Sequence, residues 1–180
     1  DFNWDWFLDL IMWRWWDKWY VCYWNAVWLW ACTTLTALPS WYYKTFDNRI
    51  ADLDWDWDLD VIFASFYDAQ SSVCINNISS FSCSQIQNSE RLWWATLVDI
   101  DWDWNLDLWW DGRVSNNRYW INNGAWDFGS PVQLWYAVTE SWTQAVSDIV
   151  DVNNDGKIDI VQFGLATQSK YFINNWCEKW

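Results

Sequence analysis

Aspartates recur in one nine-residue spacing at four places along this chain of 180 residues. The spacing is D-x-[DN]-x-D-x-x-x-D, and its copies are loop 1 (Asp1–Asp9), loop 2 (Asp52–Asp60), loop 3 (Asp99–Asp107) and loop 4 (Asp151–Asp159). In a tight loop, side chains at positions 1, 3, 5 and 9 and the backbone carbonyl at position 7 can converge on one point. Clustered oxygen atoms of this kind are typical ligands of calcium.

The predicted ligands share these five loop positions. The side-chain ligands are Asp1, Asn3, Asp5 and Asp9; Asp52, Asp54, Asp56 and Asp60; Asp99, Asp101, Asp103 and Asp107; and Asp151, Asn153, Asp155 and Asp159. The carbonyl ligands belong to Phe7, Asp58, Asn105 and Lys157. Solvated acidic turns are the alternative interpretation, since Asp is common in turns. That alternative does not explain why the same positions recur, so the sequence predicts four calcium sites.

The segments around the loops indicate what positions these ligands. An EF-hand is excluded, because it needs helical flanks and a Glu at position 12, which is Met12, Phe63, Trp110 and Gln162 in these loops. Apolar segments typical of strands follow the loops instead. The first predicted strands are Leu8–Met12, Val61–Ala64, Leu106–Trp110 and Ile158–Phe163. The second are Val21–Trp24, Val73–Ile75, Arg118–Ile121 and Lys170–Ile173. The loops start 51, 47 and 52 residues apart, which is typical of a repeat architecture.

Tryptophan is unusually frequent, with 24 residues against only 5 glycines. Position 6 of such a loop turns sharply and favours glycine. Gly156 occupies it in loop 4, but Trp6, Trp57 and Trp104 occupy it in the other loops. A residue with a side chain there costs about 1–2 kcal/mol.

A second repeated segment shows the same exchange of glycine for tryptophan. Ile121–Gly124 reads INNG, and 52 residues later Ile173–Trp176 reads INNW. Because some organisms read the codon UGA as glycine and others as tryptophan, we hypothesise that most of these tryptophans stand at native glycine positions. Trp109 and Trp120 lie in predicted strands and are expected to be genuine. The alternative is that all are genuine and act as sugar-stacking or membrane-interface residues.

With glycine at positions 4 and 6, each loop resembles the calcium loop of the FG-GAP/VCBS repeat family, found in integrin α-subunit heads and bacterial surface proteins. The resemblance covers nearly the whole chain and implies an all-β fold, a β-propeller of about three and a half to four four-stranded blades. We expect one repeat domain over residues 1–180, with repeats at approximately 1–51, 52–98, 99–150 and 151–180. Since the chain begins on a ligand, Asp1, we expect a fragment that lacks further blades.

Charge and cysteines restrict the compartment and partners. The net charge is −14 with only 10 Lys and Arg residues, so nucleic acid is not an expected partner. Cys22 and Cys74 lie in equivalent predicted strands, and Cys32 and Cys83 follow beyond a turn, so two hairpin disulfides are expected. A zinc site is the weaker alternative, since there is no His. Disulfides indicate a secreted or cell-surface protein, and no uncharged apolar run is long enough for a transmembrane span. Cys177 has no expected partner within the chain.

No catalytic site is expected. The absence of His removes the common Ser-His-Asp and Cys-His machinery. The glutamates Glu90, Glu140 and Glu178 form no pair that the sequence can place. We therefore expect a non-enzymatic module that binds a protein or glycan ligand through loops on one face, as in adhesion. The alternatives are a propeller lectin, with Tyr119 and Trp120 as sugar-stacking candidates, and a non-catalytic domain of an extracellular enzyme.

Overall fold

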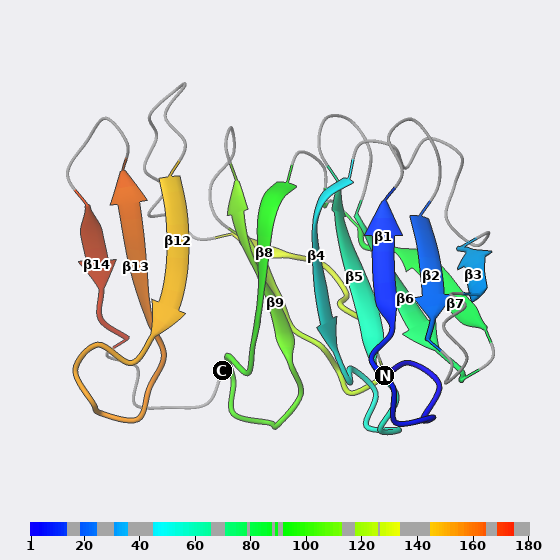
Figure 1. Ribbon diagram of the computed structural model, residues 1–180. Coiled ribbons are helices and arrows are strands. Elements are labelled where there is room, and N and C mark those ends of the chain that lie inside the picture. Colours follow the sequence, from blue (N-terminus) through cyan, green and yellow to red (C-terminus); the bar gives the residue numbers. More distant parts are fainter. Residues whose placement is uncertain are drawn as a thin grey trace.

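The chain folds as an all-β protein. The computed structural model describes residues 1–13, 19–24, 31–35, 45–65, 71–78, 80–87, 89, 92–112, 118–125, 127–133, 145–164 and 169–174. Within those ranges there are 14 strands and no helix (Figure 1). Trp176, Cys177 and the three glutamates lie outside the described residues. The predicted fold class is therefore confirmed at the level of secondary structure.

The strands form four small antiparallel sheets, in each of which neighbouring strands are consecutive in the sequence. The first sheet comprises β1 (Leu10–Trp13), β2 (Trp19–Tyr23) and β3 (Ala31–Thr34). The second comprises β4 (Thr45–Ala51), β5 (Asp60–Ser65), β6 (Ser72–Asn76) and β7 (Phe81–Gln85). The third comprises β8 (Leu92–Val98), β9 (Asp107–Gly112), β10 (Arg118–Trp120) and β11 (Val132–Gln133). The fourth comprises β12 (Ala145–Val150), β13 (Asp159–Gly164) and β14 (Lys170–Phe172).

Loops 2, 3 and 4 are each the turn of a β-hairpin. The residue before the loop pairs with the aspartate at position 9, as Ala51 does with Asp60 and Val98 with Asp107. The strand before each of these loops therefore belongs to the same sheet as the strand after it. The predicted strands after the loops are present, with small shifts in their ends. The first begins at Leu10 rather than Leu8, because Leu8 is an exposed residue of loop 1.

The sheets pack side by side with their strands roughly aligned (Figure 1). Strand β5 is buried on both faces, because it packs against the first sheet and against the third sheet. Its Val61 and Phe63 pack in one apolar cluster with Val21 of the first sheet. Its Ile62 packs in a second cluster with Trp110 of the third sheet. β8 lies against β4 and β5, and β12 lies against β8 and β9, so contacts also run from the second sheet to the third and from the third to the fourth.

Two disulfides join neighbouring strands at equivalent places in the first two sheets. Cys22 of β2 is bonded to Cys32 of β3, and Cys74 of β6 is bonded to Cys83 of β7. In both cases the two cysteines are directly opposite each other in the sheet register. Both predicted pairings are thus present. Among the described residues, no helix is long and apolar enough to cross a membrane.

Candidate metal centre

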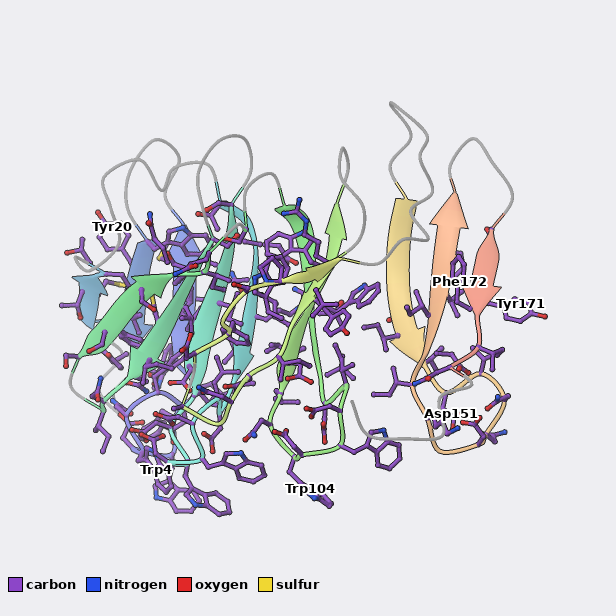
Figure 2. All side chains as sticks on the ribbon, turned by 180° about the vertical axis from the view of Figure 1, so that it is seen from behind. Trp4, Tyr20, Trp104, Asp151, Tyr171 and Phe172 are labelled. Carbon is purple, nitrogen blue, oxygen red and sulfur yellow. A yellow bond between two sulfur atoms is a disulfide. The ribbon has the colours of Figure 1, made fainter. Side chains whose placement is uncertain are left out.

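All four aspartate loops lie at one end of the sheets (Figure 1). Figure 2 shows Trp4, Trp104 and Asp151 at this end, each from a different loop. The common placement follows from the hairpin register, since each loop leads into the strand that starts at or just after position 9. The sequence repeat therefore becomes a row of acidic turns along one edge of the molecule.

The aspartate at position 9 ties each loop to its own sheet through both carboxylate oxygens. One oxygen accepts from the backbone N–H of loop position 2, which belongs to Phe2, Leu53, Ile100 and Val152, at 2.6, 2.8, 2.7 and 2.9 Å. The other oxygen accepts from a backbone N–H at or just past the end of the second strand after the loop. In loops 1 to 4 the donors are Trp24, Asn76, Asn122 and Asn174, at 3.0, 2.8, 2.8 and 2.7 Å. Asp60, Asp107 and Asp159 are fully buried. Position 9 therefore ties the start of each loop to the sheet that follows it.

The aspartates at positions 1 and 5 hold the turn itself in the same way in every loop. Position 1 accepts from the N–H of position 6, which belongs to Trp6, Trp57, Trp104 and Gly156, at 2.9, 3.0, 3.0 and 2.8 Å. Position 5 accepts from the N–H of position 7, which belongs to Phe7, Asp58, Asn105 and Lys157, at 2.9, 2.8, 2.8 and 2.9 Å. The repeated spacing is thus a repeated hydrogen-bond pattern.

In loops 2 and 3, three carboxylates converge closely enough to share a metal ion. Asp52, Asp54 and Asp60 each offer an oxygen, and these oxygens lie within 4.8 Å of one another. Asp99, Asp101 and Asp107 form the same group in loop 3. Calcium is bound by oxygens at about 2.3–2.6 Å, so two ligands on opposite sides of one ion lie about 5 Å apart. Both groups are therefore compact enough to hold one metal ion. Asp56 and Asp103, at position 5, are not members of these two groups.

Buried oxygens without a partner show that these two groups fit a cation. Oδ1 of Asp54 and Oδ1 of Asp101 are inaccessible to solvent and have no hydrogen-bond partner in the described structure. A buried carboxylate oxygen left unpaired is costly, and a bound cation removes that cost. Because the donors are all oxygens, they favour a hard ion such as calcium over zinc.

The pKa values of the aspartates in these two groups also favour a bound cation. Burial, opposed by two backbone hydrogen bonds, raises the pKa of Asp60 to about 7. Burial likewise raises the pKa of Asp107 to about 6. Burial and the charge of the neighbouring position-5 aspartate also raise the pKa of Asp54 and of Asp101. Burial is the main cause of these raised pKa values and the crowding of negative charge adds to it, and a divalent ion would favour the charged carboxylates on both counts.

Loops 1 and 4 differ from loops 2 and 3 at position 3, which is an asparagine. The side-chain amide of Asn3 donates to Asp5 Oδ2 at 3.1 Å, and that of Asn153 donates to Asp155 Oδ2 at 3.1 Å. The amide removes one negative charge and satisfies one carboxylate oxygen. We therefore expect loops 2 and 3 to bind a cation more tightly than loops 1 and 4.

Positions 4 and 6 have left-handed backbone in all four loops. In loops 1 to 4 the φ angle is 62°, 65°, 65° and 57° at position 4, and 71°, 75°, 75° and 84° at position 6. Loop 4 has Asn154 and Gly156 at these positions, which are residue types that tolerate such angles. The other three loops have tryptophan at both, although a bulky side chain is disfavoured there.

The six loop tryptophans are also poorly packed. Their exposed fractions run from 53% for Trp102 to 95% for Trp6. Two at position 4 reach the next loop, since the indole of Trp4 donates to Asp58 Oδ1 and that of Trp55 donates to Asn105 Oδ1 at 2.9 Å. Exposed indoles at positions 4 and 6 add little packing to offset the positive φ of these residues.

The two residues considered for sugar stacking lie in the core. Trp120 is completely buried, its indole donates to the carbonyl of Gln87 at 3.1 Å, and its ring packs 5.7 Å from that of Trp110. Tyr119 is 7% exposed. Neither ring offers an open face to a sugar, so the lectin alternative has no support from these side chains.

The sequence reasoning missed two asparagines that join the loops. Asn76 is the last residue of β6 and Asn122 lies two residues beyond β10, and both are completely buried. Their side chains donate to carbonyls of the preceding loop. The recurrence of Ile-Asn-Asn at the ends of these strands was the signal that could have identified them.

In comparisons with known proteins, the chain matches no protein-family model and no curated protein.

Proposed function

We propose that the chain is a calcium-binding repeat module of the FG-GAP/VCBS type, with its sheets arranged as blades of a β-propeller. The observation that carries this proposal is the pair of carboxylate groups in loops 2 and 3, each sized for one ion and each with an unpaired buried oxygen. The shared hydrogen-bond pattern of all four loops supports the extension to loops 1 and 4. The row of small sheets packed side by side supports the propeller arrangement.

The module serves recognition rather than catalysis in this proposal. Bound calcium neutralises the acidic turns and fixes them as a rigid face, on which a protein or glycan ligand is held, as in adhesion. The two disulfides support a secreted or cell-surface location, because such bonds persist in oxidising compartments. Extracellular calcium is abundant enough to fill sites of modest affinity.

The proposal includes a reading of the tryptophans. The six at loop positions 4 and 6 stand where the native protein has glycine. Three facts support this: the left-handed backbone, the exposed indoles, and the residues Asn154 and Gly156 at the same positions of loop 4. Peptide mass spectrometry of the protein from its natural source, across residues 52–60 and 99–107, tests it. Tryptophan at positions 55, 57, 102 and 104 would contradict it.

Thermal unfolding in calcium and in a chelator tests the calcium sites. A ligand that binds only the folded state at about 100 times its dissociation constant adds about 2.7 kcal/mol. We expect calcium to raise the melting temperature, and Asp54→Asn to reduce that rise by giving loop 2 the lower charge of loops 1 and 4, which have asparagine at this position. Asp127→Asn is the matched control, because Asp127 is an exposed aspartate that accepts a turn N–H outside the loops. Equal melting in calcium and chelator would contradict the proposal.

A further inference from the structure

Asn76 connects loop 1 to loop 2 through two hydrogen bonds. Its side-chain amide donates to the carbonyl of Phe2, at position 2 of loop 1, at 2.8 Å. Its backbone N–H donates to Asp60, at position 9 of loop 2, at 2.8 Å. Phe2, Asn76 and Asp60 are all buried, so water does not compete for these bonds. One residue therefore holds parts of two neighbouring loops together.

Asn122 makes the same connection between loops 2 and 3. Its side-chain amide donates to the carbonyl of Leu53, at position 2 of loop 2, at 3.1 Å. Its backbone N–H donates to Asp107, at position 9 of loop 3, at 2.8 Å. The same amide also lies 3.3 Å from the carbonyl of Leu106 in loop 3. The connection is thus a repeated feature of the sheet packing.

The two connections join into one continuous path, because each position-2 residue is held on both sides. The N–H of Leu53 donates to Asp60 of its own loop at 2.8 Å, while its carbonyl accepts from Asn122 of the next repeat. The path runs Asp9, Phe2, Asn76, Asp60, Leu53, Asn122, Asp107. A predicted calcium ligand therefore occurs in the path at each of three loops.

We infer that Asn76 and Asn122 are positioning residues that couple neighbouring calcium loops, so that an ion in one loop favours binding in the next. This inference rests on the proposed calcium function. A position-9 carboxylate that ligates an ion is held in one orientation, and it then orders the position-2 peptide and the asparagine bound to it. The next loop has less freedom to lose when its own ligands are ordered, which is positive coupling between sites.

Calcium titration by calorimetry tests the coupling on the full chain. We expect the wild-type chain to bind with a Hill coefficient above one. Asn122→Ala should bind the same number of ions with a lower Hill coefficient, because it breaks the link between loops 2 and 3 while Asn76 still joins loops 1 and 2. Asn123→Ala is the matched control, because Asn123 lies in the same turn, is exposed, and accepts from Ala125 within that turn. A general loss of stability would not by itself change the Hill coefficient of a folded protein.

A second variant keeps the test decisive if Asn122→Ala does not fold. Asp54→Ala changes a loop residue and removes a ligand of loop 2, and coupling should then weaken the remaining sites about 5-fold. Independent binding in the wild-type chain, or unchanged affinity of the remaining sites in Asp54→Ala, would overturn the coupling but leave the calcium function standing. No calcium binding by the wild-type chain would overturn both.

Discussion

Loop 4 and loop 2 follow the same backbone course with different residues at the two positions that need glycine-like freedom. Loop 4 has Asn154 and Gly156 there, and loop 2 has Trp55 and Trp57, yet all four residues have positive φ. The hydrogen bond from position 6 to position 1 is 2.8 Å in loop 4 and 3.0 Å in loop 2. The similarity shows that the aspartates, which are shared, set the turn, whereas the tryptophans adopt a positive φ that is disfavoured for a bulky residue.

A second contrast lies between the loop tryptophans and the core tryptophans. Trp57 is 76% exposed at a φ of 75°, whereas Trp120 is buried, bonded through its indole N–H and in contact with another ring. An aromatic residue buried in a strand gains the transfer of a large apolar surface from water. The same residue at an exposed left-handed position gains little and is strained. Substitution of a core tryptophan should therefore lower the free energy of unfolding, whereas substitution of a loop tryptophan should change it little or raise it.

The largest expected effect is the loss of a core tryptophan. Trp120→Ala leaves a cavity between the second and third sheets and removes the bond to the Gln87 carbonyl. We expect it to lower the free energy of unfolding by about 4 kcal/mol, measured by denaturant titration. Trp104→Ala, at an exposed loop position, is the control and should change stability by less than about 1 kcal/mol. Similar losses for both variants would remove the distinction between the two groups.

Next in size is the loss of a position-9 carboxylate. Asp60→Ala leaves the backbone N–H groups of Leu53 and Asn76 unpaired in buried surroundings. An unsatisfied buried donor is costly, so we expect a loss of about 3 kcal/mol in the free energy of unfolding. Asp127→Ala, which removes a single bond at an exposed turn, should cost under about 1 kcal/mol. A loss for Asp60→Ala as small as for Asp127→Ala would mean that position 9 does not fix the loop.

A pH effect of intermediate size is expected in the metal-free protein. Asp60 and Asp107 have pKa values of about 7 and about 6 in the folded state, above the ordinary value for Asp. The folded state therefore holds protons more tightly than the unfolded state, and the resulting stability is lost as pH rises through these values. We expect a loss on the order of 2 kcal/mol between about pH 5 and about pH 8 in a chelator.

Urea unfolding at the two pH values measures this effect. Asp60→Asn should flatten the dependence, because the amide does not titrate. Calcium should oppose the loss, since bound ligands must be deprotonated. Stability that rises with pH in the chelator would contradict the raised pKa values.

The smallest expected effect compares the loops directly. Trp57→Gly places glycine at a φ of 75° and should raise the free energy of unfolding by about 1 kcal/mol while increasing calcium affinity. Gly156→Trp makes the reciprocal change in loop 4, where φ is 84°, and should lower both. The pair is read by calcium-dependent thermal unfolding. If neither Trp57→Gly nor Gly156→Trp changed the stability or the calcium affinity, position 6 would carry no strain.

Much of the local structure could be predicted from the sequence because it depends on local rules. The strand after loop 2 was predicted from the apolar run Val61–Ala64, which lies inside β5. The pairing of Cys74 with Cys83 followed from their equivalence with the other cysteine pair. The need for glycine at position 6 followed from the sharp turn, and the positive φ of Trp57 agrees with it.

The rest depends on contacts between distant segments. That Ala51 pairs with Asp60 across loop 2, placing β4 in the same sheet as β5, could not be deduced from the repeat boundaries alone. The role of Asn122 depends on the packing of the third sheet against the second, which brings it to Leu53, 69 residues away in the chain. Likewise, the sequence makes Trp120 a candidate ligand-binding aromatic, whereas the packing of the sheets buries it completely.

The most direct test of the calcium assignment is the number of ions that the chain binds, measured by equilibrium dialysis against radiolabelled calcium. We expect four ions per chain, with the two in the carboxylate groups of loops 2 and 3 binding most tightly. The double variant Asp54→Ala, Asp101→Ala removes one ligand from each of these loops and should lose those two tight sites. A wild-type chain that retains no calcium at millimolar concentration would contradict the assignment of these loops as metal sites.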